Sequence, residues 1–133
     1  MPSPSYPSTP SGGGPSPIPQ KTPLQDQTIA QLRAEADSLE NTIRTTSDLA
    51  IYRAANDEYG AVQDRISTLL NLQLAADSAD MQNLGPGIKK AKEDLDKVLS
   101  NISKASDVIT ACAKFLGVID EFVTAAKVAA SII

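Results

Sequence analysis

The fold is decided by residues 88–133, which read IKKAKEDLDKVLSNISKASDVITACAKFLGVIDEFVTAAKVAASII. Apolar residues recur here at alternating spacings of three and four, which places them on one face of an α-helix. A seven-residue repeat of this length is typical of a helix that forms a left-handed coiled coil with another. The row consists of Ile88, Ala91, Leu95, Val98, Ile102, Ala105, Ile109, Cys112, Leu116, Ile119, Val123, Ala126, Ala130 and Ile133. Only Ser103 and Ser106 mark a place where this helix would bend or stop.

The second half of this segment carries an additional apolar row. A helix that is apolar over most of its circumference must be covered over most of it. Two interpretations therefore stay open: residues 108–133 lie in a protein core or an oligomer seam, or they meet lipid. The additional row consists of Val108, Ala111, Phe115, Val118, Phe122, Ala125, Ala129 and Ile132.

Acidic residues disfavour a permanent single membrane span in this segment. Asp120 and Glu121 lie near its middle, and an acid at the centre of a membrane helix costs about 2.5–3.5 kcal/mol on insertion scales. The narrow polar strip also lacks the excess of Lys and Arg that interfacial helices usually present to anionic lipid. Packing against protein is therefore the favoured interpretation.

Upstream of this segment, the helix predicted over residues 23–45 has a distinct start. Thr22 is a good N-cap, Pro23 is tolerated at the first helical position, and Gln25 completes a capping box. The run Thr45-Thr46-Ser47-Asp48 then interrupts the apolar stripe with residues that favour caps. We favour a break at this run, with one continuous helix as the alternative.

A second helix is predicted over residues 48–84. Its apolar stripe begins at Tyr52, passes through Tyr59 and shifts by one position after Leu69, as a stutter in a heptad pattern would. The tripeptide Gly85-Pro86-Gly87 follows, and glycine and proline after an apolar run are typical of a helix C-terminus. A short connection makes neighbouring helices antiparallel, so a hairpin turn is predicted at this tripeptide.

The sequence therefore predicts an all-α fold: an elongated antiparallel helical hairpin or coiled-coil-like bundle of about three long helices, at 23–45, 48–84 and 88–133. Residues 1–22 contain seven Pro, five Ser and three Gly. Such a segment has little to bury and is expected to be a disordered tail. The domain organisation is thus a tail at 1–22 and one helical domain at 23–133.

Composition disfavours several classes of function. The chain has no His and a single cysteine, Cys112, so the usual general base and most metal sites are missing and no cofactor is expected. The formal charge is −4 and no segment is strongly basic, which disfavours nucleic-acid binding. No nucleotide-binding or zinc-binding motif occurs, and no small-molecule substrate is evident.

We therefore expect a non-enzymatic assembly or adaptor protein that acts through coiled-coil self-association or through binding of another helical protein. The alternative is a membrane-active, pore-forming or toxin-like protein that uses residues 108–133 against lipid. The start of the chain does not resemble a classical signal peptide, so a cytoplasmic location or a signal-independent export route is expected. The expected interaction residues are Ile109, Cys112, Phe115, Leu116, Val118, Ile119, Phe122, Val123 and Ala126.

Overall fold

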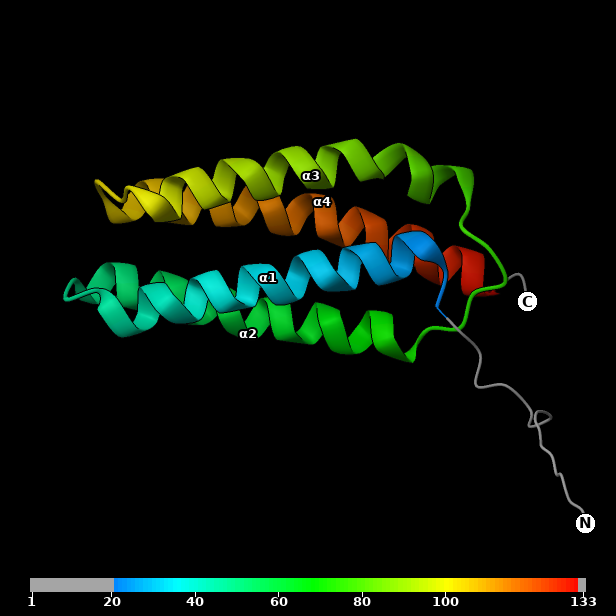
Figure 1. The fold of residues 1–133 in the computed structure, drawn as a ribbon, viewed down its shortest axis with the longest axis horizontal. Coiled ribbons are helices and arrows are strands. Elements are labelled where there is room, and N and C mark those ends of the chain that lie inside the picture. The colour runs from blue at the N-terminus through cyan, green and yellow to red at the C-terminus, as the bar shows by residue number, and fades with distance from the viewer. Residues whose placement is uncertain (1–20, 132–133) are drawn as a thin grey trace, which may run out of the picture.

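The protein is all-α, as predicted, but it has one more helix than expected. The computed structural model describes residues 21–131, and within them it contains four helices and no strand (Figure 1). The helices are α1 (Pro23–Thr45), α2 (Leu49–Asn71), α3 (Ala79–Ser100) and α4 (Ala105–Ser131). The predicted tail lies outside the described residues except for Lys21 and Thr22, and Ile132 and Ile133 of the two apolar rows also lie outside them.

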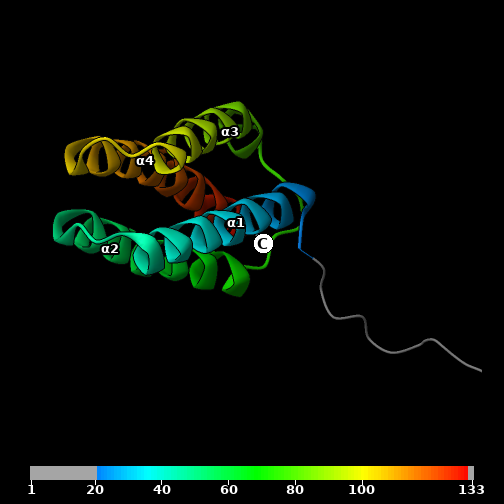
Figure 2. The same ribbon diagram turned by 60° about the vertical axis from the view of Figure 1, so that its left-hand side comes forward.

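The four helices form two antiparallel hairpins, α1–α2 and α3–α4, that pack against each other (Figures 1 and 2). α1 lies beside α2 and α3, and α4 lies beside the same two helices, whereas α1 and α4, like α2 and α3, are diagonally opposite. The segment 72–78 therefore crosses the diagonal of the bundle. We call the end with this segment the connector end, and the opposite end, with segments 46–48 and 101–104, the loop end (Figure 1).

The starts of α1 and α2 agree with the sequence. The Thr22 hydroxyl accepts a hydrogen bond from the Gln25 N–H, and the Gln25 side chain accepts from the Thr22 N–H, which completes the predicted capping box. The Asp48 carboxylate accepts from the N–H groups of Ala50 and Ile51 at 2.8 and 3.1 Å. These bonds satisfy backbone donors that a helix start leaves unpaired. The favoured break between the first two helices is confirmed.

The prediction that the second helix continues to residue 84 is wrong, because α2 ends at Asn71. Contacts from the start of α1 occupy the carbonyl groups at this end. The Gln25 amide donates to the carbonyls of Leu69 and Leu72 at 2.6 and 2.9 Å, and the Lys21 ammonium donates to Leu72 at 2.8 Å. The one-residue shift of the stripe therefore marks the end of a helix and not a stutter within it.

The predicted turn at Gly85-Pro86-Gly87 is also wrong, because these residues lie inside α3. This helix starts earlier, at a Ser78 cap whose hydroxyl accepts from the Met81 N–H at 3.2 Å. Met81 and Ile88 are buried seven residues apart, so the apolar face runs through the tripeptide without a change of phase. Pro86 is exposed, and its ring faces water on the outer side of the helix.

The long helix predicted over residues 88–133 is divided into α3 and α4 at residues 101–104. The break falls beside Ser103, one of the two serines that marked the expected weak point, and its hydroxyl lies 3.1 Å from the Asp107 carboxylate. Folding back at this loop places α4 against both α3 and α2. The two apolar rows of α4 are thereby covered, and Phe115 and Phe122 are 0% exposed.

Replacing Pro86 tests the continuous α3 directly. Proline in a helix interior removes one hydrogen bond and clashes with the preceding turn, at a cost of about 3 kcal/mol. We expect Pro86→Ala to raise the free energy of unfolding by about 1–3 kcal/mol in urea denaturation. Gly85→Ala, where an added Cβ meets nothing within 4 Å, should add about 0.5–1 kcal/mol. A loss of stability in both variants would contradict the continuous α3 and favour a turn at Gly85-Pro86-Gly87.

Candidate functional site

The nine expected interaction residues lie mostly in the bundle core. Ile109 is 55% exposed, whereas Leu116 and Val118 are half-buried at two different grooves. The other six are buried between the helices: Cys112, Phe115, Ile119, Phe122, Val123 and Ala126. The row that suggested an interaction surface is therefore largely the contact of α4 with α2 and α3.

A fully buried acid, Glu35, joins α1 to α3 at the middle of the bundle. The Lys92 ammonium lies 3.8 Å from its Oε1 atom and 2.7 Å from the Asp96 carboxylate. Burial raises the pKa of Glu35 to about 8, with further contributions from a hydrogen bond to Asp96 and from the charge of Asp96, against an opposing effect of Lys92. At neutral pH, Glu35 is therefore mostly protonated.

The proton on Glu35 keeps a buried acid uncharged. Both Glu35 carboxyl oxygens and Asp96 Oδ1 are buried and, apart from the contact between these two carboxyl groups, have no hydrogen-bond partner among the described residues. A protonated Glu35 places no negative charge beside the Asp96 carboxyl group. This arrangement avoids an uncompensated buried charge, which would cost several kcal/mol.

A second buried acid, Glu58, lies on α2 and is 5% exposed. Its Oε2 atom has no hydrogen-bond partner among residues 21–131. Burial raises the pKa of Glu58 to about 7; the positive charge of Arg65 opposes this rise and the negative charge of Asp120 adds to it. Glu58 is thus close to half-ionised at neutral pH, with no cation bonded to it.

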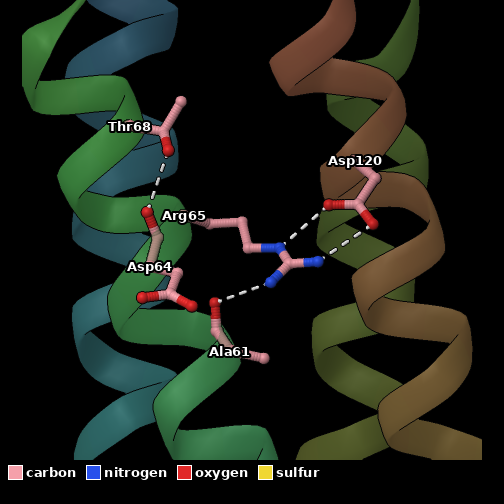
Figure 3. Close-up of polar contacts among 5 residues, drawn as sticks. All are labelled: Ala61, Asp64, Arg65, Thr68 and Asp120. Carbon is pink, nitrogen blue, oxygen red and sulfur yellow. Dashed lines mark hydrogen bonds and ion pairs between the residues drawn. The ribbon is translucent and has the colours of Figure 1, made fainter.

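Arg65 is held by other groups and joins α2 to α4 (Figure 3). Its guanidinium donates to both Asp120 carboxylate oxygens at 2.9 and 3.2 Å and to the Ala61 carbonyl at 3.2 Å. The hydrogen bond to Asp120 raises the pKa of Arg65 further. This pair and the contact of Glu35 with Lys92 connect the two hairpins on opposite sides of the bundle.

Cys112 lies near both buried acids. Burial, together with the charges of Glu58 and Glu35, raises the pKa of its thiol to about 12. The thiol is therefore protonated at neutral pH, and a thiol is a much weaker nucleophile than a thiolate. Its place in the core agrees with the role of a small buried apolar side chain.

Sequence reasoning missed both buried acids because it considered only apolar residues for the core face, and on α2 it also placed two stripe positions one residue too far along. Tyr52 and Tyr59 were assigned to the buried face, whereas Ile51 and Glu58 are buried and Tyr52 is 42% exposed. Glu58 lies three residues after Ala55 and four before Val62, both buried. That spacing was a usable signal, but a charged residue was not considered for the core face.

The surface is hollowed along three of the helix–helix seams. The α3–α4 groove consists of two hollows of about 710 and 560 Å³ that share Gly117 and Glu121. The α2–α4 groove has a volume of about 650 Å³ and lies on the loop-end side of the Arg65–Asp120 pair. A smaller hollow of about 400 Å³ opens between α1 and α3 toward the same end. The seams between the hairpins are thus open toward the loop end.

Comparisons with known proteins find no relatives: no protein family, no curated protein and no solved structure matches this chain. Within residues 21–131, no group of three or more metal-ligating side chains is placed to hold an ion. No helix in the described part of the chain combines the length and apolar character needed to cross a bilayer.

The two buried acids make stability depend on pH in a defined direction. Their pKa values in the folded chain, about 8 and about 7, lie above the ordinary value of 4.5. The folded chain therefore binds these protons more tightly than the unfolded chain, and this stabilisation is lost as pH rises through 7 and 8. If both acids titrate at these values, lowering the pH from about 9 to about 5 should raise the free energy of unfolding by about 6 kcal/mol.

Matched variants identify the source of this pH dependence. In the double variant Glu35→Gln/Glu58→Gln, the dependence measured by urea denaturation should be largely removed, because the amides stay neutral at every pH. Glu40→Gln, at an exposed position of α1, should keep the dependence of the unchanged chain. An undiminished slope in the double variant would contradict the assignment to these two acids.

Proposed function

We propose that this chain is a non-enzymatic helical assembly protein that pairs with a second copy of itself through the outer face of α4. The observation that carries the proposal is the position of Gly117 in the middle of the α3–α4 groove, between Lys114 and Glu121. Interfaces of this kind form where a helix offers close backbone approach and complementary charge.

The outer face of α4 has the spacing of a helix-pairing surface. Its residues are four and three apart in turn, which is the a/d spacing of a coiled coil. Gly117 is exposed, and a Cβ added there would meet nothing within 4 Å, so a second helix has room to approach its backbone. The row consists of Thr110, Lys114, Gly117, Glu121, Thr124 and Val128.

The charges of this row favour a second copy over an unrelated partner. Neither Lys114 nor Glu121 forms an ion pair with another described residue. Lys114 precedes Gly117 by three residues, and Glu121 follows it by four. Two α4 helices that cross antiparallel at Gly117 would therefore place Lys114 of each copy near Glu121 of the other, as a two-fold interface requires.

This proposal rests on a different surface from the one expected from the sequence. The expectation of self-association arose because one chain did not seem able to cover both apolar rows of residues 108–133. The four-helix arrangement covers them, since Phe115 and Phe122 are fully buried. The support for self-association now comes from the outer face, where Val128 is 57% exposed.

Membrane activity is the second candidate. The same apolar rows would meet lipid if the α3–α4 hairpin separated from α1–α2, and the open seams at the loop end favour separation from that end. Separation would also expose Glu35 and Glu58, whose burial is described above. If the protein is membrane-active, it should co-sediment with liposomes. Self-association through α4 predicts no co-sedimentation.

A pair of glycine variants tests the assembly surface. Gly117→Gln places a side chain in the centre of the groove and should raise the dimer dissociation constant by about tenfold or more, which is about 1.4 kcal/mol. Gly60→Gln is the matched control, since Gly60 is an exposed helical glycine on α2 with equal space around it. Sedimentation equilibrium over a range of concentrations gives both constants.

Charge reversal separates the proposed pairing from a general loss of association. Lys114→Glu should weaken the dimer because the new glutamate would lie near Glu121 of the other copy, and the two negative charges repel. Combining Lys114→Glu with Glu121→Lys should recover the dimer because opposite charges would again face each other. The proposal is contradicted if the chain stays monomeric at all concentrations, or if Gly117→Gln leaves the dimer dissociation constant unchanged. Liposome co-sedimentation that survives these variants would favour the membrane-active alternative.

A further inference from the structure

The α2–α4 groove has the features of a small-molecule site and lies apart from the proposed assembly face. Its volume of about 650 Å³ falls within the range of about 300–1,000 Å³ that is usual for ligand clefts. Its sides are mainly apolar, as such clefts usually are. The apolar lining residues are Ala50, Ala54, Ala61, Ile109, Ala113 and Leu116.

One acid gives this groove a chemical preference. Glu58 lines it, is buried with 5% of its surface exposed, and has a buried Oε2 atom without a hydrogen-bond partner among the described residues. Arg65, whose positive charge acts on Glu58, is engaged by Asp120 and Ala61. A buried carboxyl oxygen without a donor is costly, and a ligand that supplies both a donor and a positive charge would remove that cost.

The remaining charged residues of the groove do not supply that partner. Arg53 and Asp57 are both exposed, with opposite charges that offset each other, and neither is hydrogen-bonded to Glu58. The α3–α4 groove offers no comparable group, because none of the buried unpartnered oxygens lines it. The unpartnered acid therefore distinguishes the α2–α4 groove from the α3–α4 groove.

We propose that the α2–α4 groove binds primary aliphatic amines. The ammonium group donates hydrogen bonds to the Glu58 carboxylate, and the alkyl chain lies along the wall formed by Ile109, Leu116 and the alanines. An ammonium carries three donors and a full charge in a small volume, so it suits a single carboxylate in a mainly apolar groove. A neutral alcohol of equal length offers one donor and no charge.

The ionisation of Glu58 gives the site an expected response to pH. An ammonium favours the charged form of the carboxyl group, so binding lowers the pKa of Glu58 from its raised value of about 7. Proton release then accompanies binding at neutral pH, and affinity increases as the pH rises toward 7 and levels off above it. Arg65, Asp120, Glu35 and Cys112 are the other titratable groups coupled to Glu58 across α1, α2 and α4.

Titration with n-hexylammonium chloride tests the proposal on the full chain. At about pH 8, isothermal calorimetry should give saturable one-to-one binding, and NMR shifts should centre on the methyl groups of Ile109 and Leu116. The neutral isostere 1-hexanol should bind about tenfold more weakly or worse, since a charge-assisted hydrogen bond is replaced by a neutral one.

Three variants decide the role of Glu58. Glu58→Gln should lower hexylammonium affinity by about tenfold or more, whereas Glu35→Gln, which changes a buried acid outside the groove, should retain it. Ala113→Phe, at an exposed wall position, should block binding while Glu58 stays in place. The proposal is overturned by absence of saturable binding, by equal affinity for hexanol, or by a folded Glu58→Gln variant with unchanged affinity. Because Gly117 lines the α3–α4 groove and does not line the α2–α4 groove, loss of the dimer in Gly117→Gln should leave amine binding in place.

Discussion

The structure depends on how two helical hairpins close around buried carboxyl groups. Each hairpin has an apolar face that it cannot cover alone, so the two must pack together. That packing places Glu35 and Glu58 in the interior, where an isolated charge is expensive. Glu35 is mostly protonated at neutral pH and lies 3.8 Å from the Lys92 ammonium, which makes its burial tolerable. Glu58 has no ion pair among the described residues, and it lines the α2–α4 groove.

The positions of the inter-hairpin contacts explain where the surface is open. Arg65 and Asp120 join α2 to α4, while Lys92 joins α3 to Glu35 of α1. Beyond these contacts, toward the loop end, small residues such as Ala54 and Ala113 leave the α2–α4 seam unfilled. One α4 helix therefore has two distinct surfaces: a polar outer face, which we propose for pairing, and an apolar edge beside α2, which we propose for a ligand.

Much of the fold was predictable from local signals. The capping box at Thr22 and Gln25 gave the start of α1, and the polar run ending at Asp48 gave the start of α2. The segment 72–78 was not predictable in this way, because side chains of Lys21 and Gln25, about 50 residues away in sequence, occupy the carbonyl groups there. Pro86 led to the wrong prediction of a turn for a related reason. Proline disfavours a helix interior, but the tertiary packing of Met81 and Ile88 on either side outweighs that local preference.

The candidate site was less predictable than the fold. The second apolar row of α4 correctly indicated that this helix is covered on two sides, but the sequence does not say whether the covering helix belongs to the same chain. Phe115 and Phe122 turned out to face the chain's own core. A search for apolar positions does not find Glu58, because it is an acid, although its spacing from Ala55 and Val62 fits the buried face.

The most direct test of hairpin closure around these acids is a titration of the Glu side-chain carboxyl carbons by NMR. If the hairpins close as described, one glutamate should titrate with a pKa of about 8 and another with a pKa of about 7, and Glu35→Gln and Glu58→Gln should remove those two transitions in turn. If both acids instead titrate near the ordinary value of 4.5, water reaches them and the hairpins do not close around a buried carboxyl layer.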